Sequence, residues 1–114
     1  MTEQKVLCRL DELEDPGSRG FEARETGAAW DFFIVRKQGA VFGYRNSCPH
    51  TGAPLDWMPD SFLDPEGGFI QCAMHGALFR VDNGKCLRGP CVGQSLEPVI
   101  LRVLDGQVVL ERLG

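Results

Sequence analysis

The sequence lacks the features of a membrane protein or a nucleic-acid binder. Its 114 residues contain no run of 18 apolar residues, so it predicts no membrane-spanning segment. Basic residues are outnumbered, with 12 Lys and Arg against 16 Asp and Glu and a formal net charge of −4. Nucleic-acid binders normally carry a dense basic stripe. We therefore expect neither a membrane nor a nucleic acid as partner.

Groups for hydrolytic or nucleotide chemistry are also scarce. The two histidines each stand beside a cysteine, which leaves none for a Ser-His-Asp triad. The early glycines Gly17, Gly20 and Gly27 lack the strand–helix context of a phosphate-binding loop. Residues 1–5 lack the basic, apolar and small-residue features of a secretory leader, which predicts a cytoplasmic location. Thiols stay reduced there, so metal binding explains five cysteines better than disulfides do.

The abundance of turn-forming residues predicts an all-β fold. Fourteen Gly and seven Pro require short elements and frequent turns, and 43% hydrophobic residues suffice for a single domain over residues 1–114. We expect an antiparallel β-sandwich of eight or nine strands, at 5–10, 21–25, 30–36, 40–45, 69–72, 77–81, 85–88, 97–104 and 107–112. At most one helical turn is expected, in the acidic loops.

One strand, three turns and one long loop of this pattern have more specific signals. Apolar residues on both faces of 30–36 indicate a central strand. Hairpin turns are expected at Gln38-Gly39, Asn83-Gly84 and Asp105-Gly106, with Asn-Gly suited to a type I′ turn. The apolar residues in 46–69 do not recur with the period of a strand or a helix, which predicts a loop. A loop this long in a small domain is usually functional.

Two short segments carry the candidate chemistry. Each contains one cysteine and one histidine on a loop after a strand, in the patterns Cys48-Pro49-His50 and Cys72-Ala73-Met74-His75. Two thiolates and two imidazoles satisfy tetrahedral zinc. One Cys and one His from each segment is instead typical of a Rieske [2Fe–2S] centre, in which two Cys hold one iron and two His the other.

Residues 48–55 (CPHTGAPL) and 72–79 (CAMHGALF) resemble the two cluster-binding boxes of the Rieske family. The resemblance extends to Asn83-Gly84 and Gly89-Pro90, so it covers a cluster-binding subdomain of two loops at about 44–92. It implies a Rieske-like antiparallel β-sandwich with one [2Fe–2S] cluster per chain. Transferred to this sequence, it implies Cys48 and Cys72 on the inner iron, His50 and His75 on the outer iron, and a cap formed by Gly89 and Pro90.

Three positions depart from high-potential members of the family. Ala53 and Met74 stand where respiratory Rieske proteins have cysteines, so their inter-loop disulfide is expected to be absent. Ala77 replaces a serine whose hydroxyl donates to a sulfur, and fewer such bonds favour the oxidised cluster. We expect a reduction potential of about −150 mV.

The resemblance implies an electron carrier rather than an enzyme: a soluble ferredoxin working between a reductase and a terminal enzyme, above all an oxygenase. At 114 residues the chain is too short to include an oxygenase's mononuclear-iron domain. One alternative is a small Rieske subunit of a reductase such as nitrite reductase. Another is a zinc-stabilised binding module without a redox role.

Residues 57–68 look like an insertion between the two boxes. Trp57, Met58, Phe62 and Phe69 are expected to pack this loop beneath the cluster. The alternative is that Trp57 or Phe62 belongs to a docking surface.

The remaining cysteines and the acidic stretch are expected to be structural or passive. Cys8 is predicted to be a core residue. Cys86 and Cys91 are predicted to be passive reduced thiols, with a disulfide or a redox-sensing thiol as the alternative. The acidic residues at 11–15 predict a solvated loop, with steering toward a basic partner as the alternative.

Overall fold

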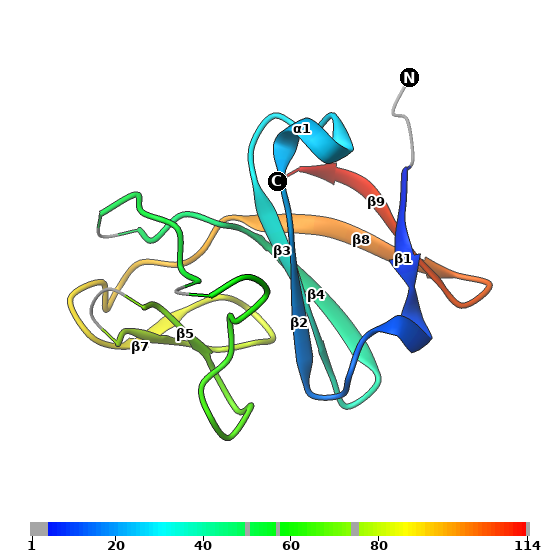
Figure 1. Cartoon of the computed structure of the whole chain (residues 1–114). Helices are drawn as coiled ribbons and strands as arrows, with labels where there is room; N and C mark the ends of the chain where they lie inside the picture. Colours follow the sequence, from blue (N-terminus) through cyan, green and yellow to red (C-terminus); the bar gives the residue numbers. More distant parts are fainter. Residues whose placement is uncertain (1–4, 50, 57, 74–75, 114) are drawn as a thin grey trace.

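The chain folds into two antiparallel β-sheets, as the sequence predicts (Figure 1). The computed structural model describes residues 5–49, 51–56, 58–73 and 76–113, with side chains up to 111. A six-stranded sheet has the order β1-β9-β8-β4-β3-β2, and a three-stranded sheet has the order β5-β6-β7. The strands are β1 (Lys5–Arg9), β2 (Gly17–Phe21), β3 (Phe32–Lys37), β4 (Ala40–Arg45), β5 (Ile70–Gln71), β6 (Leu78–Phe79), β7 (Cys86–Arg88), β8 (Pro98–Leu104) and β9 (Gln107–Leu113).

The strand β3 is buried on both faces, which confirms the prediction for 30–36. Phe32, Phe33, Ile34 and Val35 are all fully buried. Successive side chains of a strand point to opposite faces. Phe33 and Val35 accordingly belong to one hydrophobic cluster, and Phe32 and Ile34 to another.

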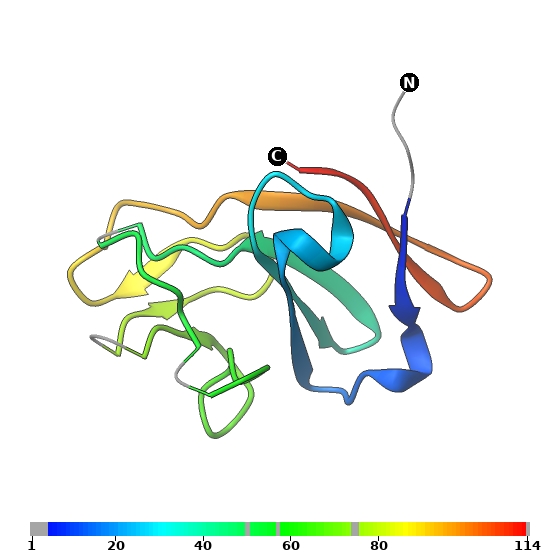
Figure 2. The ribbon, with the colours of Figure 1, turned by 45° about the horizontal axis from the view of Figure 1, so that its top comes forward.

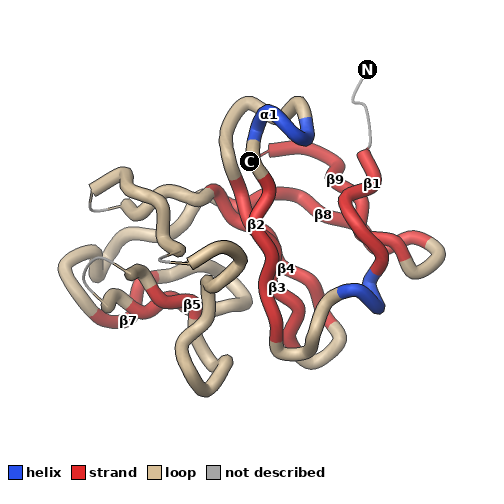
Figure 3. Tube along the Cα trace, in the orientation of Figure 1, coloured by secondary structure: helices blue, strands red, loops and turns tan. Residues whose placement is uncertain are grey.

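These two clusters lie on opposite faces of the large sheet. One joins β3 and β4 to the small sheet and its loops, and it contains Cys48 and Cys72. The other is built from β1, β2, β3, β8 and β9, and it contains Cys8, which confirms Cys8 as a core residue. In Figures 1 and 2 the loops and short strands that follow β4 gather on one side of the large sheet. Figure 3 shows that this part consists mostly of loops, whereas the other part consists mostly of strands.

Two of the three expected tight turns have the predicted backbone. Gln38 and Gly39 have φ values of 53° and 81°, and Asp105 and Gly106 have values of 50° and 75°. Two consecutive positive φ values are what a type I′ turn requires. At Asn83-Gly84 the predicted hairpin forms between β6 and β7, but its turn is not type I′, because only Gly84 of that pair has a positive φ, of 72°. The connection there is wider, and the Asn83 side chain accepts a hydrogen bond from the Lys85 N–H at 2.9 Å.

The predicted strand at 21–25 is also wrong. The strand lies earlier, at β2, and Ala23–Thr26 form a single helical turn, α1. The Glu25 carboxylate accepts a hydrogen bond from the Glu22 N–H at 3.2 Å. Gly27 ends the turn in the left-handed region, at φ 77°. Local capping therefore ends β2 at Phe21. Residues 17–21 (GSRGF) have a weak intrinsic preference for a strand, and they form one because they pair with β3.

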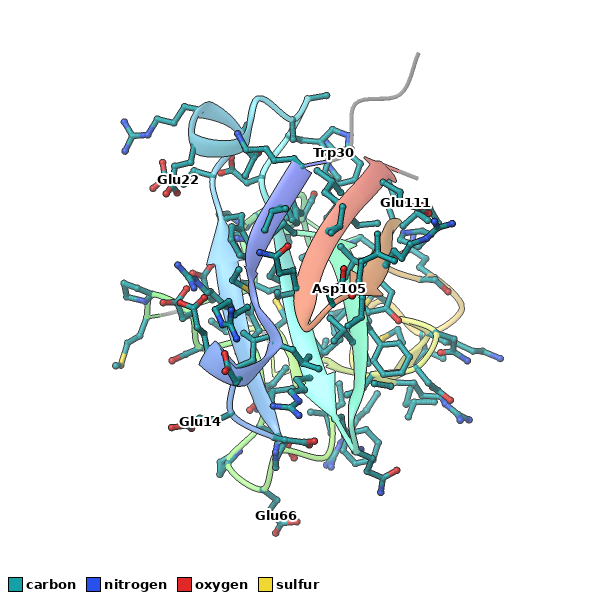
Figure 4. The ribbon with its side chains drawn as sticks, turned by 90° about the vertical axis from the view of Figure 1, so that its right-hand side faces the viewer. Glu14, Glu22, Trp30, Glu66, Asp105 and Glu111 are labelled. Atoms are coloured by element: carbon teal, nitrogen blue, oxygen red, sulfur yellow. The ribbon has the colours of Figure 1, made fainter. Side chains whose placement is uncertain are left out.

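The acidic residues at 11–15 are all exposed, as predicted, but one of them also has a structural role. The two carboxylate oxygens of Asp15 accept hydrogen bonds from the N–H groups of Gln38 and Gly39, both at 2.7 Å. Asp15 thus fixes the β3–β4 turn while remaining exposed, a structural role that the sequence did not predict. Figure 4 shows Glu14, Glu22 and Glu66 directed outward at the periphery of the fold, and all three are exposed. The 3-10 turn Leu10–Glu12 (η1) contains the first two residues of this stretch.

Within the described ranges, the helical elements are too short or too polar to cross a membrane.

Candidate metal centre

The first predicted ligand segment follows β4 and folds back on itself. The Cys48 N–H donates to the Ala53 carbonyl oxygen at 2.8 Å, and the Gly52 N–H donates to the Cys48 carbonyl oxygen at 2.7 Å. Gly52 has a φ of 78°, a conformation that glycine adopts without strain. The loop is therefore closed by two backbone hydrogen bonds that both involve Cys48.

The second ligand segment, between β5 and β6, repeats this arrangement. The Cys72 N–H donates to the Ala77 carbonyl oxygen at 2.9 Å, and the Gly76 N–H donates to the Cys72 carbonyl oxygen at 3.0 Å. Gly76 has a φ of 65°. In both loops the cysteine is followed by a left-handed glycine four positions later. The spacing Cys-x-x-x-Gly is the sequence signal of this shared frame.

The two loops are tied to each other through Leu55. The Ala73 N–H donates to the Leu55 carbonyl oxygen at 2.9 Å. The Leu55 N–H in turn donates to the Asn46 side-chain oxygen at 2.7 Å, and the Asn46 amide donates to Asp56 at 3.1 Å. Sequence reasoning missed Asn46, because an Asn just after a strand is an ordinary loop residue.

The two predicted cysteine ligands lie on the buried side of these loops. Cys48 is 2% exposed and Cys72 is fully buried, and both belong to the cluster between the two sheets. Gly52 and Ala73, from the same loops, are exposed. The structure therefore brings two thiols from separate segments into one core, while the loop backbone next to them reaches the surface.

A third segment, which joins β7 to β8, packs against both ligand loops. Gly89 has a φ of 106°, and a Cβ atom there would lie 2.9 Å from the Cα of Ala77. Cys91 is fully buried. Burial raises the pKa of Cys91 to about 12, helped by a hydrogen bond with Cys86 and, to a smaller degree, by the charges of Cys86 and Cys48. Gly89 and Pro90 are exposed. Their role as a cap remains a prediction.

The histidines of the predicted ligand set, His50 and His75, lie outside the described residues, as do Trp57 and Met74. Within the described ranges no group of three or more Cys, His, Asp or Glu side chains is placed to hold a metal ion. The donor chemistry nevertheless fits the predicted centre. Two buried sulfur donors suit a thiolate-bound iron, and each loop still has one histidine in its sequence.

The aromatic residues of the long loop divide between core and surface. Phe62 is fully buried and stacks on Phe33 at a ring-centroid distance of 4.2 Å, so the docking role considered for Phe62 is wrong. Met58 is 48% exposed and Phe69 is 38% exposed. The prediction that all of these residues pack the loop therefore holds for Phe62 and is wrong for Met58 and Phe69. For Trp57 it lies outside the described residues.

Comparison with known proteins gives a family match. A family model of the Rieske [2Fe–2S] domain matches residues 3–109. No curated protein sequence matches the chain.

Solved structures share the fold at low sequence identity. The ferredoxin of carbazole 1,9a-dioxygenase from Nocardioides aromaticivorans IC177 has a TM-score of 0.76 and 22% identity, covering 97% of this chain and 99% of that one. A chain in the complex of reduced oxygenase and oxidized ferredoxin in carbazole 1,9a-dioxygenase has a TM-score of 0.78 and 19% identity, covering 100% and 98%. The terminal oxygenase from the same Nocardioides strain has a TM-score of 0.75 and 21% identity, covering 99% of this chain and 30% of that one.

Proposed function

The chain belongs to the Rieske [2Fe–2S] domain family, with one [2Fe–2S] cluster per chain, and on that premise we propose that it is an electron carrier, the ferredoxin component of an oxygenase system. The observation that carries the proposal is the pair of matched loops that place Cys48 and Cys72 in one buried core. When bound, the cluster supplies a site that gains and loses one electron at a time.

Within this proposal each ligand residue has a defined role. Cys48 and Cys72 hold one iron as thiolates, and His50 and His75 hold the other. Burial of both cysteines excludes water from their side of the site. Backbone N–H groups of the two loops that hydrogen-bond sulfur would tune the potential. The predicted potential of about −150 mV stays part of the proposal.

The choice of an oxygenase as electron acceptor is supported by similarity. The ferredoxin structures match over nearly their whole length, and one of them was solved in complex with a reduced oxygenase. The partners proposed for this chain are accordingly a reductase that donates the electron and a terminal oxygenase that accepts it.

The test starts with anaerobically purified protein. Iron and acid-labile sulfide are quantified, and absorption and low-temperature EPR spectra are recorded before and after dithionite. We expect two irons and two sulfides per chain, and a Rieske-type EPR signal only after reduction. A colourless protein that holds one zinc ion would overturn the proposal in favour of a zinc-stabilised module.

Substitutions then test the ligand assignment. Cys48→Ser, His50→Ala, Cys72→Ser and His75→Ala are each expected to lose the EPR signal. Cys8→Ser is the matched control, because Cys8 is buried in the other hydrophobic cluster. Retention of an unchanged signal by any of the four ligand variants would contradict the role given to that residue.

A stopped-flow experiment tests the carrier role. The reduced protein is mixed with an oxidised Rieske oxygenase, and we expect reoxidation of the carrier to match reduction of the oxygenase. Absence of electron transfer to any such oxygenase, together with stable co-purification with a large reductase, would identify a reductase subunit instead.

A further inference from the structure

Two cysteines outside the proposed ligand set lie in β7 and in the segment that joins β7 to β8. Cys86 begins β7, and Cys91 lies five residues later, beyond Gly89 and Pro90. The Cys86 N–H donates to the Gln94 carbonyl oxygen at 3.0 Å, and the Gln94 N–H donates to the Cys91 carbonyl oxygen at 2.9 Å. The backbones of both cysteines are thus hydrogen-bonded to Gln94, which keeps the two residues close together while the loop is closed.

The two sulfur atoms face each other inside this loop. Their Sγ atoms lie 2.8 Å apart, and both residues are thiols in this structure. Cys86 is 2% exposed and Cys91 is fully buried. A disulfide needs a sulfur–sulfur distance of about 2.05 Å, so a small adjustment of the side chains is sufficient to form the bond.

We propose that Cys86 and Cys91 form a reversible dithiol–disulfide couple, a two-electron site distinct from the one-electron cluster. The sequence predicts passive reduced thiols, with a disulfide as the alternative, and the distance of 2.8 Å between the two sulfurs supports the alternative. The oxidant is a small-molecule disulfide of the glutathione class.

The chemistry balances as ordinary thiol–disulfide exchange. One cysteine sulfur attacks the small disulfide, forms a mixed disulfide and releases one thiolate. The second cysteine sulfur attacks the mixed disulfide and releases the other. Two protein S–H bonds and one small-molecule S–S bond are broken, and one protein S–S bond is formed. Both protons pass to the released thiolates, so two protein sulfurs are oxidised and two small-molecule sulfurs are reduced.

The surroundings make this exchange slower than that of an exposed thiol. Because the pKa of Cys91 is raised by burial, Cys91 remains protonated at neutral pH and is a weak attacking group. Access requires local opening of residues 87–90, all of which are exposed at the surface. Leu87 is 46% exposed. The couple therefore responds to sustained rather than brief oxidation.

A disulfide at this position would also act on the ligand loops. The segment touches Ala77 through Gly89, and Cys91 belongs to the same buried cluster as Cys48 and Cys72. Linking Cys86 to Cys91 restricts opening of the segment. We expect the oxidised form to lose its cluster more slowly in the presence of an iron chelator, a consequence that rests on the proposed function.

The disulfide itself is tested by peptide mapping. The cluster-loaded protein is incubated anaerobically with excess oxidised glutathione, denatured in N-ethylmaleimide and digested with trypsin. Cleavage after Lys85, Arg88 and Arg102 separates the two cysteines into fragments 86–88 and 89–102. We expect these fragments to be joined by a bond that dithiothreitol breaks. The link persists in Cys8→Ser and is lost in Cys86→Ser and in Cys91→Ser.

Any one of three results would overturn the proposed Cys86–Cys91 couple. They are alkylation of both cysteines in the treated wild-type protein, glutathione attached to each cysteine separately, and a cross-link from Cys91 to Cys48. The wild-type map decides the matter even if a serine variant does not fold. Cluster absorbance is recorded before the incubation, so that failure to bind a cluster is distinguished from failure to form the disulfide.

Discussion

The ring of Phe62 stacks on the ring of Phe33, with centroids 4.2 Å apart and ring planes inclined by 5°. Phe33 belongs to β3 of the large sheet, and Phe62 belongs to the loop between the two ligand segments. Both rings are fully buried. This contact fastens the longest loop of the chain to the sheet, and a Cβ at Gly20 would also lie 3.2 Å from the Phe62 ring.

Phe62→Ala is expected to lower the free energy of unfolding by about 3 kcal/mol, because it removes buried area and leaves a cavity. Urea denaturation followed by circular dichroism measures this change. Met58→Ala, in the same loop but 48% exposed, should change stability by less than about 0.5 kcal/mol. Equal effects of the two substitutions would contradict the anchoring role of Phe62.

Gly89 and Gly93 allow backbone strain to be separated from steric contact. Both have φ near 100°, at 106° and 96°, but a Cβ at Gly93 would meet nothing within 4 Å. Gly93→Ala is expected to cost about 1 kcal/mol from strain alone. Gly89→Ala is expected to cost about 1–3 kcal/mol more, because its Cβ would overlap Ala77. Thermal unfolding of both variants measures the difference. A smaller loss of stability for Gly89→Ala than for Gly93→Ala would show that the segment moves to accommodate the added Cβ and would contradict the prediction.

Asn46→Ala removes the side chain that holds Leu55, the residue through which the two ligand loops are tied to each other. The expected loss is about 1–2 kcal/mol, because the Leu55 N–H loses its acceptor. We also expect the variant to release iron to a chelator faster than wild type, as followed by absorbance. Asn83→Ala is the control, since Asn83 likewise accepts a backbone hydrogen bond but lies outside both loops. Indistinguishable iron release in the two variants would argue against a positioning role for Asn46.

Burial of Tyr44 makes the free energy of unfolding depend on pH in the alkaline range. Its hydroxyl donates to the Val81 carbonyl oxygen at 2.7 Å, and burial, with a smaller contribution from the charge of Asp82, raises its pKa well above the ordinary value. The unfolded chain then releases the tyrosine proton first, so the stability falls as pH rises above about 10.

Tyr44→Phe tests this dependence. The variant is expected to be less stable by about 1 kcal/mol near pH 8, because Val81 loses its donor. The difference from wild type should shrink above about pH 10 as the tyrosine contribution is lost. Urea unfolding at a series of pH values measures this difference in the free energy of unfolding. A difference that stays constant across this range would contradict a raised pKa for Tyr44.

The sequence predicted those features that depend on neighbouring residues. The run of apolar residues in β3 and the turns at Gln38-Gly39 and Asp105-Gly106 follow from local pattern and backbone preference. The two ligand segments were found because Cys and His stand close together in each. Features that depend on distant partners were missed.

Asp15 accepts its hydrogen bonds from residues more than 20 positions away, and Phe62 stacks on a strand residue 29 positions earlier. The strand β2, with the sequence GSRGF, has weak intrinsic preference and forms because β3 offers it a complete ladder of partners. The proximity of Cys86 and Cys91 likewise depends on how the loop closes through Gln94.

The two ligand loops share one backbone closure, from the cysteine N–H to the carbonyl five positions on and from the glycine N–H back to the cysteine. Neither of these bonds involves the three residues between Cys and Gly, which are 49–51 in one loop and 73–75 in the other. The closure thus fixes the two ends of each loop without using the residues between Cys and Gly, of which Ala73 instead donates to Leu55 of the other loop. A histidine stands second after the cysteine in one loop and third in the other, so one backbone closure carries its histidine at two different positions.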